Sequence, residues 1–382
     1  MNISDFSTFY KNKKILITGH TGFKGSWMCE ILSNLGAEVV GYSLEPPTTP
    51  SLFELLNFKD NIKTYIGDVR SLKNLKEVFE KEKPQIVIHM AAQPLVRKSY
   101  EDPVGTFETN VMGTVNVLEC CRLFESVRSV VNVTTDKVYK NLEQDKGYTE
   151  TDFLDGYDPY SNSKSCSELV THSYINSFFN VSVDAKDSDK NSESIIRCAV
   201  STCRAGNVIG GGDFAKDRII PDCFRAAQGM DDICVRNPFS VRPYQHVLEP
   251  LFVYLYIAWK QYEDPSVAGS YNVGPDDDSC VNTGTLTDCF VKEWNKLLLA
   301  DCEGNPRPLL KWINKSDKGP HEAGFLKLDC SLLKKTFGWS PKWDIETAVK
   351  KSVEWYGIYL SGKSVKECMD RQIKEYMECL KA

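Results

Sequence analysis

The sequence has 382 residues, of which 42% are hydrophobic and 26% are charged, a composition typical of globular proteins with a buried core. Its formal net charge of −6 repels nucleic-acid phosphates, which excludes a general nucleic-acid binder but leaves room for local basic pockets. The length fits one large domain or two smaller ones.

The cysteines and the apolar segments indicate a cytoplasmic protein. Fourteen cysteines are present without a C-x-x-C pair, and disulfide scaffolds belong to short secreted chains, so we expect reduced thiols. No cluster of His, Cys and Asp has metal-ligand spacing, so no metal is expected. The N-terminus lacks the apolar region of a signal peptide. The longest apolar stretch, residues 251–259, is too short to span a bilayer and fits a buried helix.

Short apolar strands and helical stretches alternate from the N-terminus to about residue 205. Strands are predicted at 13–19, 38–43, 62–69, 84–92, 129–135 and 195–203. Helices are predicted at 26–36, 72–83, 108–124 and 158–179. This alternation implies a parallel sheet with helices on both faces, so the predicted fold is α/β, a Rossmann-type doubly wound sheet.

The second part of the chain is less regular. Residues 10–204 are expected to form the first domain, within which the charged segment 184–194 is expected to be an exposed, mobile loop. Prolines and aromatic residues cluster at 236–250 and 304–343. We therefore expect residues 205–382 to form mainly a smaller lobe over the carboxyl ends of the strands, with some segments returning to the first domain.

A glycine-rich loop follows the first predicted strand. The stretch "ITGHTGFKGSW" places Gly19, Gly22 and Gly25 between a strand and a helix. Glycine permits the tight turn there and lets backbone N–H groups approach a pyrophosphate at the helix N-terminus. Three glycines alone also fit a plain structural turn, but this context favours dinucleotide binding.

The end of the second strand bears on which dinucleotide is bound. An acidic residue usually binds the adenosine ribose there, whereas here Ser43 holds the expected position and Glu45 comes slightly late. No arginine lies at this strand end to hold a 2′-phosphate, which favours NAD over NADP. Asp68, after the third strand, could accept a hydrogen bond from the adenine amino group. It could equally be a loop aspartate that caps the helix beginning at Ser71.

Tyr160 and Lys164 stand four residues apart in "YSNSK" on a predicted helix, so they share one face. A lysine ammonium beside a phenol favours the phenolate and lowers the tyrosine pKa. Tyr160 is therefore a candidate general base, and a hydroxyl of Thr134 or Thr135 at the preceding strand end could bind the same substrate oxygen. Such spacing also arises by chance, and the prediction gains its force from the glycine loop before it.

These elements together resemble the extended short-chain dehydrogenase/reductase family over nearly the whole chain. The resemblance implies an N-terminal Rossmann domain, a C-terminal lobe that binds a nucleotide sugar, and the catalytic set Thr135, Tyr160 and Lys164. The segments "AAQ" and "TNVMGT" match further parts of the cofactor site. The cofactor-binding residues expected on this basis are Gly19, Thr21, Gly22, Phe23, Gly25, Ser43, Asp68, Val69, Ala91, Ala92, Gln93, Asn110, Tyr160 and Lys164.

Seven separated strings resemble, within that family, the branch that dehydrates CDP-glucose. They are "GHTGFKGSW", "QPLVRKSYEDP", "TTDKVY", "RAGNVIGGGD", "DRIIPD", "RNPFSVRPYQHVLEPL" and "PHEAGFLKLDCSLLKKTFGW". The resemblance implies oxidation of the glucose at C4 by NAD, loss of water across C5 and C6, and return of the hydride to C6. The segment 184–194 looks altered relative to the family and lies outside these strings.

Asp136 and Lys137 follow Thr135 directly and are assigned by the resemblance to the loss of water. Relatives that act on TDP-sugars have Asp-Glu here. Asp136 would need to be protonated to donate to the leaving hydroxyl, and Lys137 would need to be neutral to take the C5 proton. Burial favours both states, whereas close contact between the two groups opposes them. The alternative is an ordinary surface ion pair at a strand end.

A nucleotide diphosphate requires positive charge, and arginine donates to phosphate in pairs. The substrate-binding residues expected are Arg97, Asn207, Arg204, Arg218, Arg236, Arg242 and His321. Any single arginine could be a solvated surface charge, so the prediction concerns the group, with Arg242 and Asn207 in the most family-like strings. His321 could instead be a loop histidine bonded to backbone.

Other functions remain open at this point. Another nucleotide-sugar enzyme of the fold, a 4-epimerase or a TDP- or GDP-sugar dehydratase, is the nearest alternative, although an epimerase has no need of Asp136 and Lys137. A non-catalytic NAD-binding protein would not need Thr135, Tyr160 and Lys164. The resemblance also implies a homodimer formed through two helices of each subunit, and a place in deoxysugar synthesis for surface polysaccharides such as O-antigen.

Overall fold

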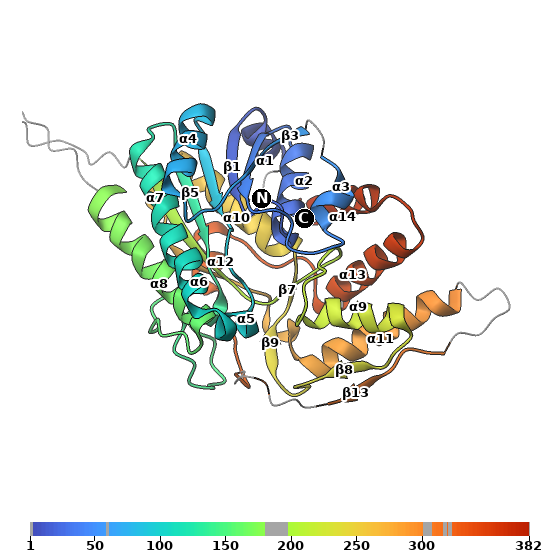
Figure 1. Ribbon diagram of the computed structural model, residues 1–382. Coiled ribbons are helices and arrows are strands. Elements are labelled where there is room, and N and C mark those ends of the chain that lie inside the picture. The colour runs from blue at the N-terminus through green and yellow to red at the C-terminus, as the bar shows by residue number, and fades with distance from the viewer. Residues whose placement is uncertain are drawn as a thin grey trace, which may run out of the picture.

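The protein was analysed as a computed structural model, which describes residues 3–58, 61–179, 198–300, 308–315, 319 and 323–381 (Figure 1). The predicted loop at 184–194 and the candidate residue His321 lie outside the described residues.

A seven-stranded parallel sheet forms the centre of the molecule, in the order β11-β6-β5-β4-β1-β2-β3. Its strands are β1 (Lys14–Thr18), β2 (Glu38–Ser43), β3 (Ile62–Ile66), β4 (Ile86–His89), β5 (Ser129–Val133), β6 (Ala199–Ala205) and β11 (Ser270–Val273). The predicted α/β fold with a parallel, doubly wound sheet is confirmed, and each of the six predicted strands is present.

Successive residues of each strand point to opposite faces of the sheet and enter two separate hydrophobic cores. In β1, Ile15 and Ile17 belong to one core, whereas Leu16 between them belongs to the other. Val131 and Val130 of β5 divide in the same way. Because both faces are covered, these strands read as continuous apolar runs in the sequence.

Helices cover both faces of the sheet (Figure 1). One face carries α4 (Leu72–Glu82), α7 (Gly113–Leu123) and α8 (Pro159–Tyr174), which pack side by side. The other carries α2 (Phe23–Asn34) and α10 (Leu248–Glu263), with α1 (Ile3–Tyr10), α3 (Leu52–Leu56) and α14 (Val365–Cys379) against them. The predicted helices are present, and a π-helical turn, Glu108–Met112, precedes α7.

The remaining elements gather beyond the carboxyl ends of the strands, at the lower right of Figure 1. The helices there are α9 (Ile219–Gly229), α11 (Thr283–Ala300) and α13 (Ile345–Leu360). Three small two-stranded sheets pair β7 (Val208–Ile209) with β10 (Gln245–His246), β9 (Val241–Pro243) with β12 (Cys280–Asn282), and β8 (Ile233–Val235) with β13 (Trp312–Asn314). Short helices α5 (Val96–Glu101), α6 (Pro103–Phe107) and α12 (Ser331–Phe337) complete the fold.

Two segments from the later part of the chain belong to the central sheet. The apolar stretch 251–259 lies in α10, a buried helix as predicted, which packs on β5 and β6. Strand β11 pairs with β6 at the sheet edge, and this strand was not predicted from the sequence. Gln261 of α10 ties these parts together, because its amide donates to the Val130 carbonyl at 2.9 Å.

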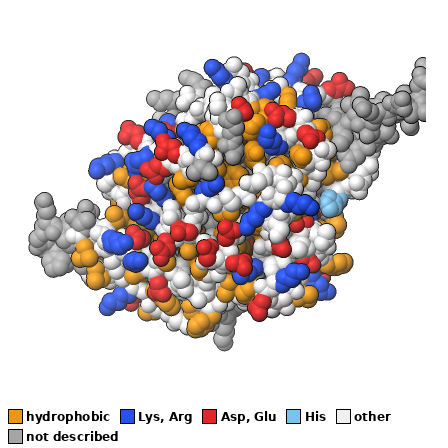
Figure 2. All heavy atoms as spheres, turned by 180° about the vertical axis from the view of Figure 1, so that it is seen from behind, with side chains coloured by type: hydrophobic (Ala, Val, Ile, Leu, Met, Phe, Trp, Pro, Cys, Tyr) orange, Lys and Arg blue, Asp and Glu red, His pale blue; other side chains and the backbone are white. Residues whose placement is uncertain are grey.

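The charges on the surface, the apolar helices and the cysteines can be compared with what the composition predicts. On the face shown in Figure 2, basic and acidic side chains are interspersed rather than separated by sign. No helix within the described residues is both long and apolar enough to cross a membrane. Thirteen cysteines lie in the described parts of the chain, and each of them is a free thiol.

Phe252 of α10 is fully buried and joins both ends of the chain, with ring centroids 5.9 Å from Phe6 and 5.0 Å from Tyr376. We expect Phe252→Ala to lower the free energy of unfolding by about 3–5 kcal/mol, because it leaves a cavity among three elements. Urea denaturation followed by circular dichroism measures this. Leu299→Ala, at a side chain 65% exposed, is the control and should change stability by about 0.5 kcal/mol or less. Equal effects of both substitutions would contradict the expectation.

Candidate active site

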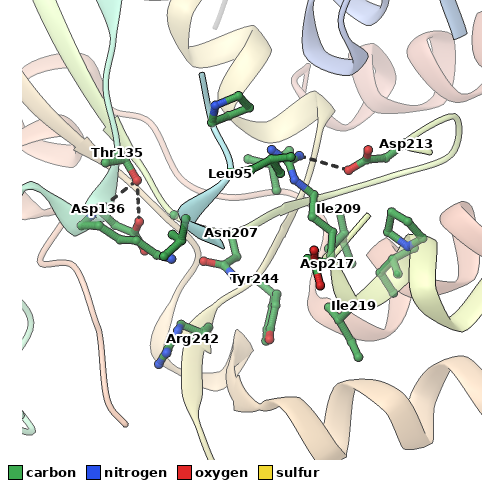
Figure 3. Close-up of a pocket in the computed structure, with 18 of the residues that line it drawn as sticks. Leu95, Thr135, Asp136, Asn207, Ile209, Asp213, Asp217, Ile219, Arg242 and Tyr244 are labelled. Atoms are coloured by element: carbon green, nitrogen blue, oxygen red, sulfur yellow. Dashed lines mark hydrogen bonds and ion pairs between the residues drawn. The ribbon is translucent and has the colours of Figure 1, made fainter. Parts of the chain in front are cut away.

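A cavity of about 300 Å³ opens where the strand ends of the central sheet meet the smaller lobe (Figure 3). Thr135 and Asp136 lie at one side of it and Asp213 and Asp217 at the other, with Asn207 and Tyr244 between them. Its lining also contains Tyr160 and Lys164. Residues predicted from widely separated motifs therefore share one cavity.

The glycine loop packs directly onto the end of β4. Gly19 has a φ of +77°, and a Cβ there would lie 2.8 Å from the Ala91 backbone nitrogen. A Cβ on Gly25 would lie 2.2 Å from the Gly19 carbonyl oxygen. No side chain caps the N-terminus of α2, whose N-cap residue is Gly22. The uncapped N–H groups and the close backbone approach fit a pyrophosphate, as the sequence predicts for a dinucleotide.

The end of β2 lies next to this loop. Thr21 Oγ1 is 2.7 Å from Ser43 Oγ and donates to the Leu44 carbonyl at 2.9 Å. The Asp68 carboxylate accepts from the Arg70 guanidinium at 2.7 Å and from its backbone N–H at 2.9 Å. The N-cap of α4 is Ser71, whose side chain accepts from the Asn74 backbone N–H, so the alternative in which Asp68 caps this helix is wrong.

Several further residues of the predicted cofactor site form hydrogen bonds or packing contacts with neighbouring parts of the protein. Asn110 accepts from the Gln93 backbone N–H at 2.9 Å and donates to Ser163 Oγ at 2.9 Å, which ties the end of β4 to α8. Val69 is buried beside Gly113, where a Cβ would meet it at 2.8 Å. The other members lie as follows: Ala92 lines the cavity, Ala91 packs against the core of the α4 face, and Phe23 packs against the core of the α2 face.

The Asp-Lys pair does not belong to the preceding strand. Strand β5 ends at Val133, and Asp136–Val138 form a single 3₁₀ turn. Thr135 is the N-cap of that turn, and its hydroxyl donates to Asp136 Oδ1 at 2.9 Å. Alternation along a strand therefore does not apply to Asp136 and Lys137, and both side chains line the cavity.

Asp136 is a buried carboxyl group with an unsatisfied oxygen. Its side chain is 1% exposed, and Oδ2 has no hydrogen-bond partner within the described residues. Burial raises the pKa of Asp136 above its usual value, and the Lys137 ammonium and the Thr135 hydroxyl only partly oppose this. Lys137 itself is half-buried. Burial thus shifts Asp136 toward the protonated form that a proton donor requires.

Tyr160 and Lys164 lie in the first two turns of α8, which begins with Pro159 and has Asp158 as its N-cap. Lys164 Nζ donates to the Val133 carbonyl at 3.1 Å, and burial lowers the pKa of Lys164 to about 8. The expected lowering of the tyrosine pKa is not found in the protein alone. Burial raises the pKa of Tyr160 to about 12 and outweighs the Thr135 hydrogen bond.

Arg204 does not reach the cavity, which corrects its prediction as a substrate residue. It is fully buried beneath the strand ends, where its guanidinium donates to Glu168 Oε2 at 2.9 Å and to Tyr139 Oη at 2.8 Å. Glu168 lies one turn beyond Lys164 in α8 and also accepts from Thr134. Arg204 therefore neutralises a buried carboxylate instead of binding a phosphate.

The other predicted substrate residues within the described part of the chain come together at the cavity. They are Arg97, Asn207, Arg218, Arg236 and Arg242. Arg218 donates to Asp213 at 3.1 Å and Arg236 to Asp217 at 2.6 Å. Arg242 is nearly buried, and its guanidinium donates to the Ala323 carbonyl. This wall thus combines cations with carboxylates that partly neutralise them.

Among the residues that line the cavity and were missed in the sequence are Lys24, Asp213, Asp217 and Tyr244. Burial and the charges of Arg218 and Lys164 lower the pKa of Lys24 to about 7. A signal did exist for Lys24, which is the one basic residue among the loop glycines. Asp213 and Asp217 close or open two of the quoted strings, but nothing local sets them apart from other loop aspartates.

Comparisons with known proteins agree with this geometry. The sequence profile described as GDP-mannose 4,6 dehydratase matches residues 16–202. The CDP-glucose 4,6-dehydratase of Salmonella typhimurium is 42% identical over 370 residues, 97% of either chain. The crystal structure of dTDP-glucose 4,6-dehydratase from Bacillus anthracis in complex with NAD gives a TM-score of 0.70 at 19% identity, over 93% of this chain and 99% of that one. A UDP-glucose 4-epimerase from Thermus thermophilus in complex with NAD gives 0.71 at 22% identity, over 90% and 98%.

The Glu168–Arg204 pair should be essential for stability, because each side chain is at most 1% exposed and each charge depends on the other. We expect Glu168→Gln to lower the free energy of unfolding by about 3–5 kcal/mol, since it leaves the guanidinium buried without its counter-charge. Denaturant titration measures this. The matched control is Glu263→Gln, which removes a carboxylate from the exposed pair with Lys260 and should cost about 1 kcal/mol or less. A Glu168→Gln protein as stable as the parent would contradict the assignment.

Proposed function

The chain belongs to the extended short-chain dehydrogenase/reductase family, and from this premise we propose that it converts CDP-glucose into CDP-4-keto-6-deoxyglucose and water. The observation that supports the proposal is the buried carboxyl group of Asp136, whose pKa burial raises, in the same cavity as Tyr160 and Lys164. Tyr160 and Lys164 suffice for simple oxidation, whereas Asp136 would serve the elimination of water.

NAD is the cofactor, and the glycine loop is the part of the chain that would hold it. The uncapped N-terminus of α2 would bind the pyrophosphate, and Ser43 at the end of β2 would bind the adenosine ribose. When bound, NAD supplies the reversible hydride acceptor that oxidation at C4 and reduction at C6 require.

We assign the removal of the C4 hydroxyl proton to Tyr160, with the Thr135 hydroxyl on the same substrate oxygen. A phenol with a pKa of about 12 is neutral at physiological pH, so its ionisation requires positive charge beside it. Lys164, on the same face of α8, and Arg218, whose charge already favours the phenolate, are the cations that this chain provides.

The loss of water is assigned to the 3₁₀ turn after β5. Oxidation at C4 acidifies the proton at C5, which a base must remove as the C6 hydroxyl leaves. Asp136, whose pKa burial raises, would donate a proton to the leaving hydroxyl. Lys137, half-buried beside it, would take the C5 proton in its neutral form and later return it.

The wall opposite the turn would bind the nucleotide. Arg97, Arg218, Arg236 and Arg242 provide guanidinium groups for the diphosphate, and Asn207 adds an amide at the strand end. The small lobe that carries most of these residues is our proposed substrate lobe, consisting mainly of residues 205–382.

We further propose a homodimer that forms through the outer faces of α7 and α8. Large apolar side chains are exposed along this side, and they are Val104, Met112, Leu123, Leu169 and Phe178. Exposed apolar side chains on and beside two neighbouring helices fit a helical interface. We also propose a cytoplasmic location, which the cysteine pattern of the sequence indicates, and a role in deoxysugar synthesis for surface polysaccharides, which the family resemblance implies.

A UDP-glucose-type 4-epimerase is the second candidate, because enzymes of that name share the fold. An epimerase returns the hydride to C4 and eliminates no hydroxyl group. It therefore has no need of a buried acid after Thr135, which makes Asp136 the residue that distinguishes the two activities.

The first test is a substrate screen with CDP-, TDP-, GDP- and UDP-glucose. We expect CDP-glucose to give a 4-keto-6-deoxy product that absorbs in alkali, with no net reduction of NAD, because the hydride taken from C4 is returned within the same turnover. The alkali absorbance and the mass of the product measure this. A product with the galactose configuration would rule out the dehydratase and support the epimerase.

The second test concerns Asp136→Asn. The amide keeps the size of the side chain but cannot donate an acidic proton, so C4 oxidation should proceed while water loss slows by about 10²–10⁴-fold. Rapid-quench analysis should then detect the 4-keto, 6-hydroxy sugar nucleotide accumulating on the enzyme. Asn141→Asp, a change of the same size outside the cavity lining, is the control. If Asp136→Asn turned over at the parental rate, Asp136 would not be the acid.

A further inference from the structure

Two arginines of the cavity come from opposite sides of it. Arg97 lies in α5, the short helix that follows β4 of the central sheet. Arg236 directly follows β8, which pairs with β13 in the small lobe. Both side chains line the cavity, so its two walls each provide a guanidinium group.

Asp217 joins these two arginines. Its Oδ1 accepts from Arg236 Nη1 at 2.6 Å and lies 3.7 Å from Arg97 Nε. Asp217 stands in the loop between β7 and α9 and lines the cavity itself (Figure 3). Its φ of 61° places it in the left-handed region, which most residues avoid and which aspartate tolerates. One carboxylate oxygen thus connects the sheet side of the cavity with the lobe side.

A carboxylate is an unexpected neighbour in a cavity that should hold a diphosphate, because like charges repel. The repulsion is reduced here, since one carboxylate sits between two guanidinium groups and the cluster keeps a net charge of +1. A guanidinium group has five N–H donors in a fixed plane, so one arginine can donate to more than one acceptor at the same time. The same pair restrains a long side chain that would otherwise sample many rotamers.

We propose that Asp217 is a positioning residue: it holds Arg97 and Arg236 as a pair that faces the cavity, and this pair binds the diphosphate of the substrate. The inference rests on the proposed function and identifies a residue that contributes to recognition of the substrate diphosphate. Asp217 acts through the two arginines and touches no reacting atom. Its effect should therefore fall on substrate binding rather than on the chemical step.

Simple electrostatics predicts the opposite change in substrate affinity when Asp217 is replaced, which makes the proposal testable. Asp217→Asn removes a negative charge from the cluster, and charge alone would then strengthen the binding of an anion. If Asp217 positions the arginines, the loss of order outweighs the gained charge and binding weakens.

The experiment measures CDP binding by titration calorimetry, which does not depend on turnover, and then steady-state kinetics with CDP-glucose. We expect Asp217→Asn to weaken CDP binding about tenfold and to raise KM by a similar factor, with kcat within about twofold. Cytidine, which carries no phosphate, should bind both proteins equally. Asp217→Glu, which keeps the charge, should restore part of the affinity.

Glu354→Gln is the matched control. Glu354 also bridges two cations, at 2.6 Å to Arg371 and 3.5 Å to Lys351, and is similarly exposed, but it lies on α13 outside the cavity lining. Its substitution should leave CDP binding unchanged. Arg236→Met, alone and combined with Asp217→Asn, completes a double-mutant cycle in which the two losses should not add.

Unchanged or tighter CDP binding in Asp217→Asn would overturn the proposal, as would losses that add fully in the cycle. The proposed reaction and the proposed role of Asp217 can be disproved independently. If the parent protein bound CDP but made no keto sugar, the proposed reaction would fail while the calorimetric comparison still decided the role of Asp217.

Discussion

The candidate site depends on the way α8 is held against the end of β5. Lys164 donates to the carbonyl of Val133, the last residue of the strand, at 3.1 Å. Ser165 donates to the Val138 carbonyl at 2.7 Å, and Glu168 closes a buried ion pair with Arg204 at 2.9 Å. The first two contacts fix the strand end and the 3₁₀ turn after it, and the third ties the same helix to β6. The phenol of Tyr160 and the carboxyl group of Asp136 owe their common cavity to this anchoring.

Burial sets the chemistry of this cavity more than the pairing of charges does. It raises the pKa of Asp136 although Lys137 is its neighbour in sequence, and it raises the pKa of Tyr160 to about 12 although Lys164 shares its helix face. An elimination needs a protonated carboxyl group, and the raised pKa of Asp136 shifts it in that direction. For Tyr160 burial is a cost, which positive charge near the phenol must offset.

The sequence predicts well those features that depend on local pattern. The strands of the central sheet and the helices between them were recognised because an apolar run or a helical period is visible within a few residues. Strand β11 was missed, since "SYNV" has no local signal and its place at the sheet edge comes from a pairing with β6 that lies far away in the chain. Local patterns carry no information on contacts between distant segments. The family resemblance uses the whole chain, and it therefore predicted more of the candidate site residues than any single motif did.

Side-chain direction sets the second limit. Arg204 and Arg242 both stand in family-like strings, yet one turns under the sheet to meet Glu168 and the other lines the cavity. Asp136 and Lys137 share the cavity because the chain leaves the strand before them, a backbone change that alternation could not anticipate. Asp217 was overlooked because its proposed role depends on contacts with Arg97 and Arg236, which are distant from it in the chain.

The central claim is that one cavity carries out oxidation, elimination and reduction on a single bound sugar. The most direct test uses CDP-glucose that carries deuterium at C4, mixed with CDP-glucose that carries carbon-13 throughout the sugar and no deuterium. Mass spectrometry and NMR of the product locate the label. The account predicts deuterium at C6 of the carbon-12 molecules only. Deuterium retained at C4, lost to solvent or transferred to the carbon-13 molecules would contradict it.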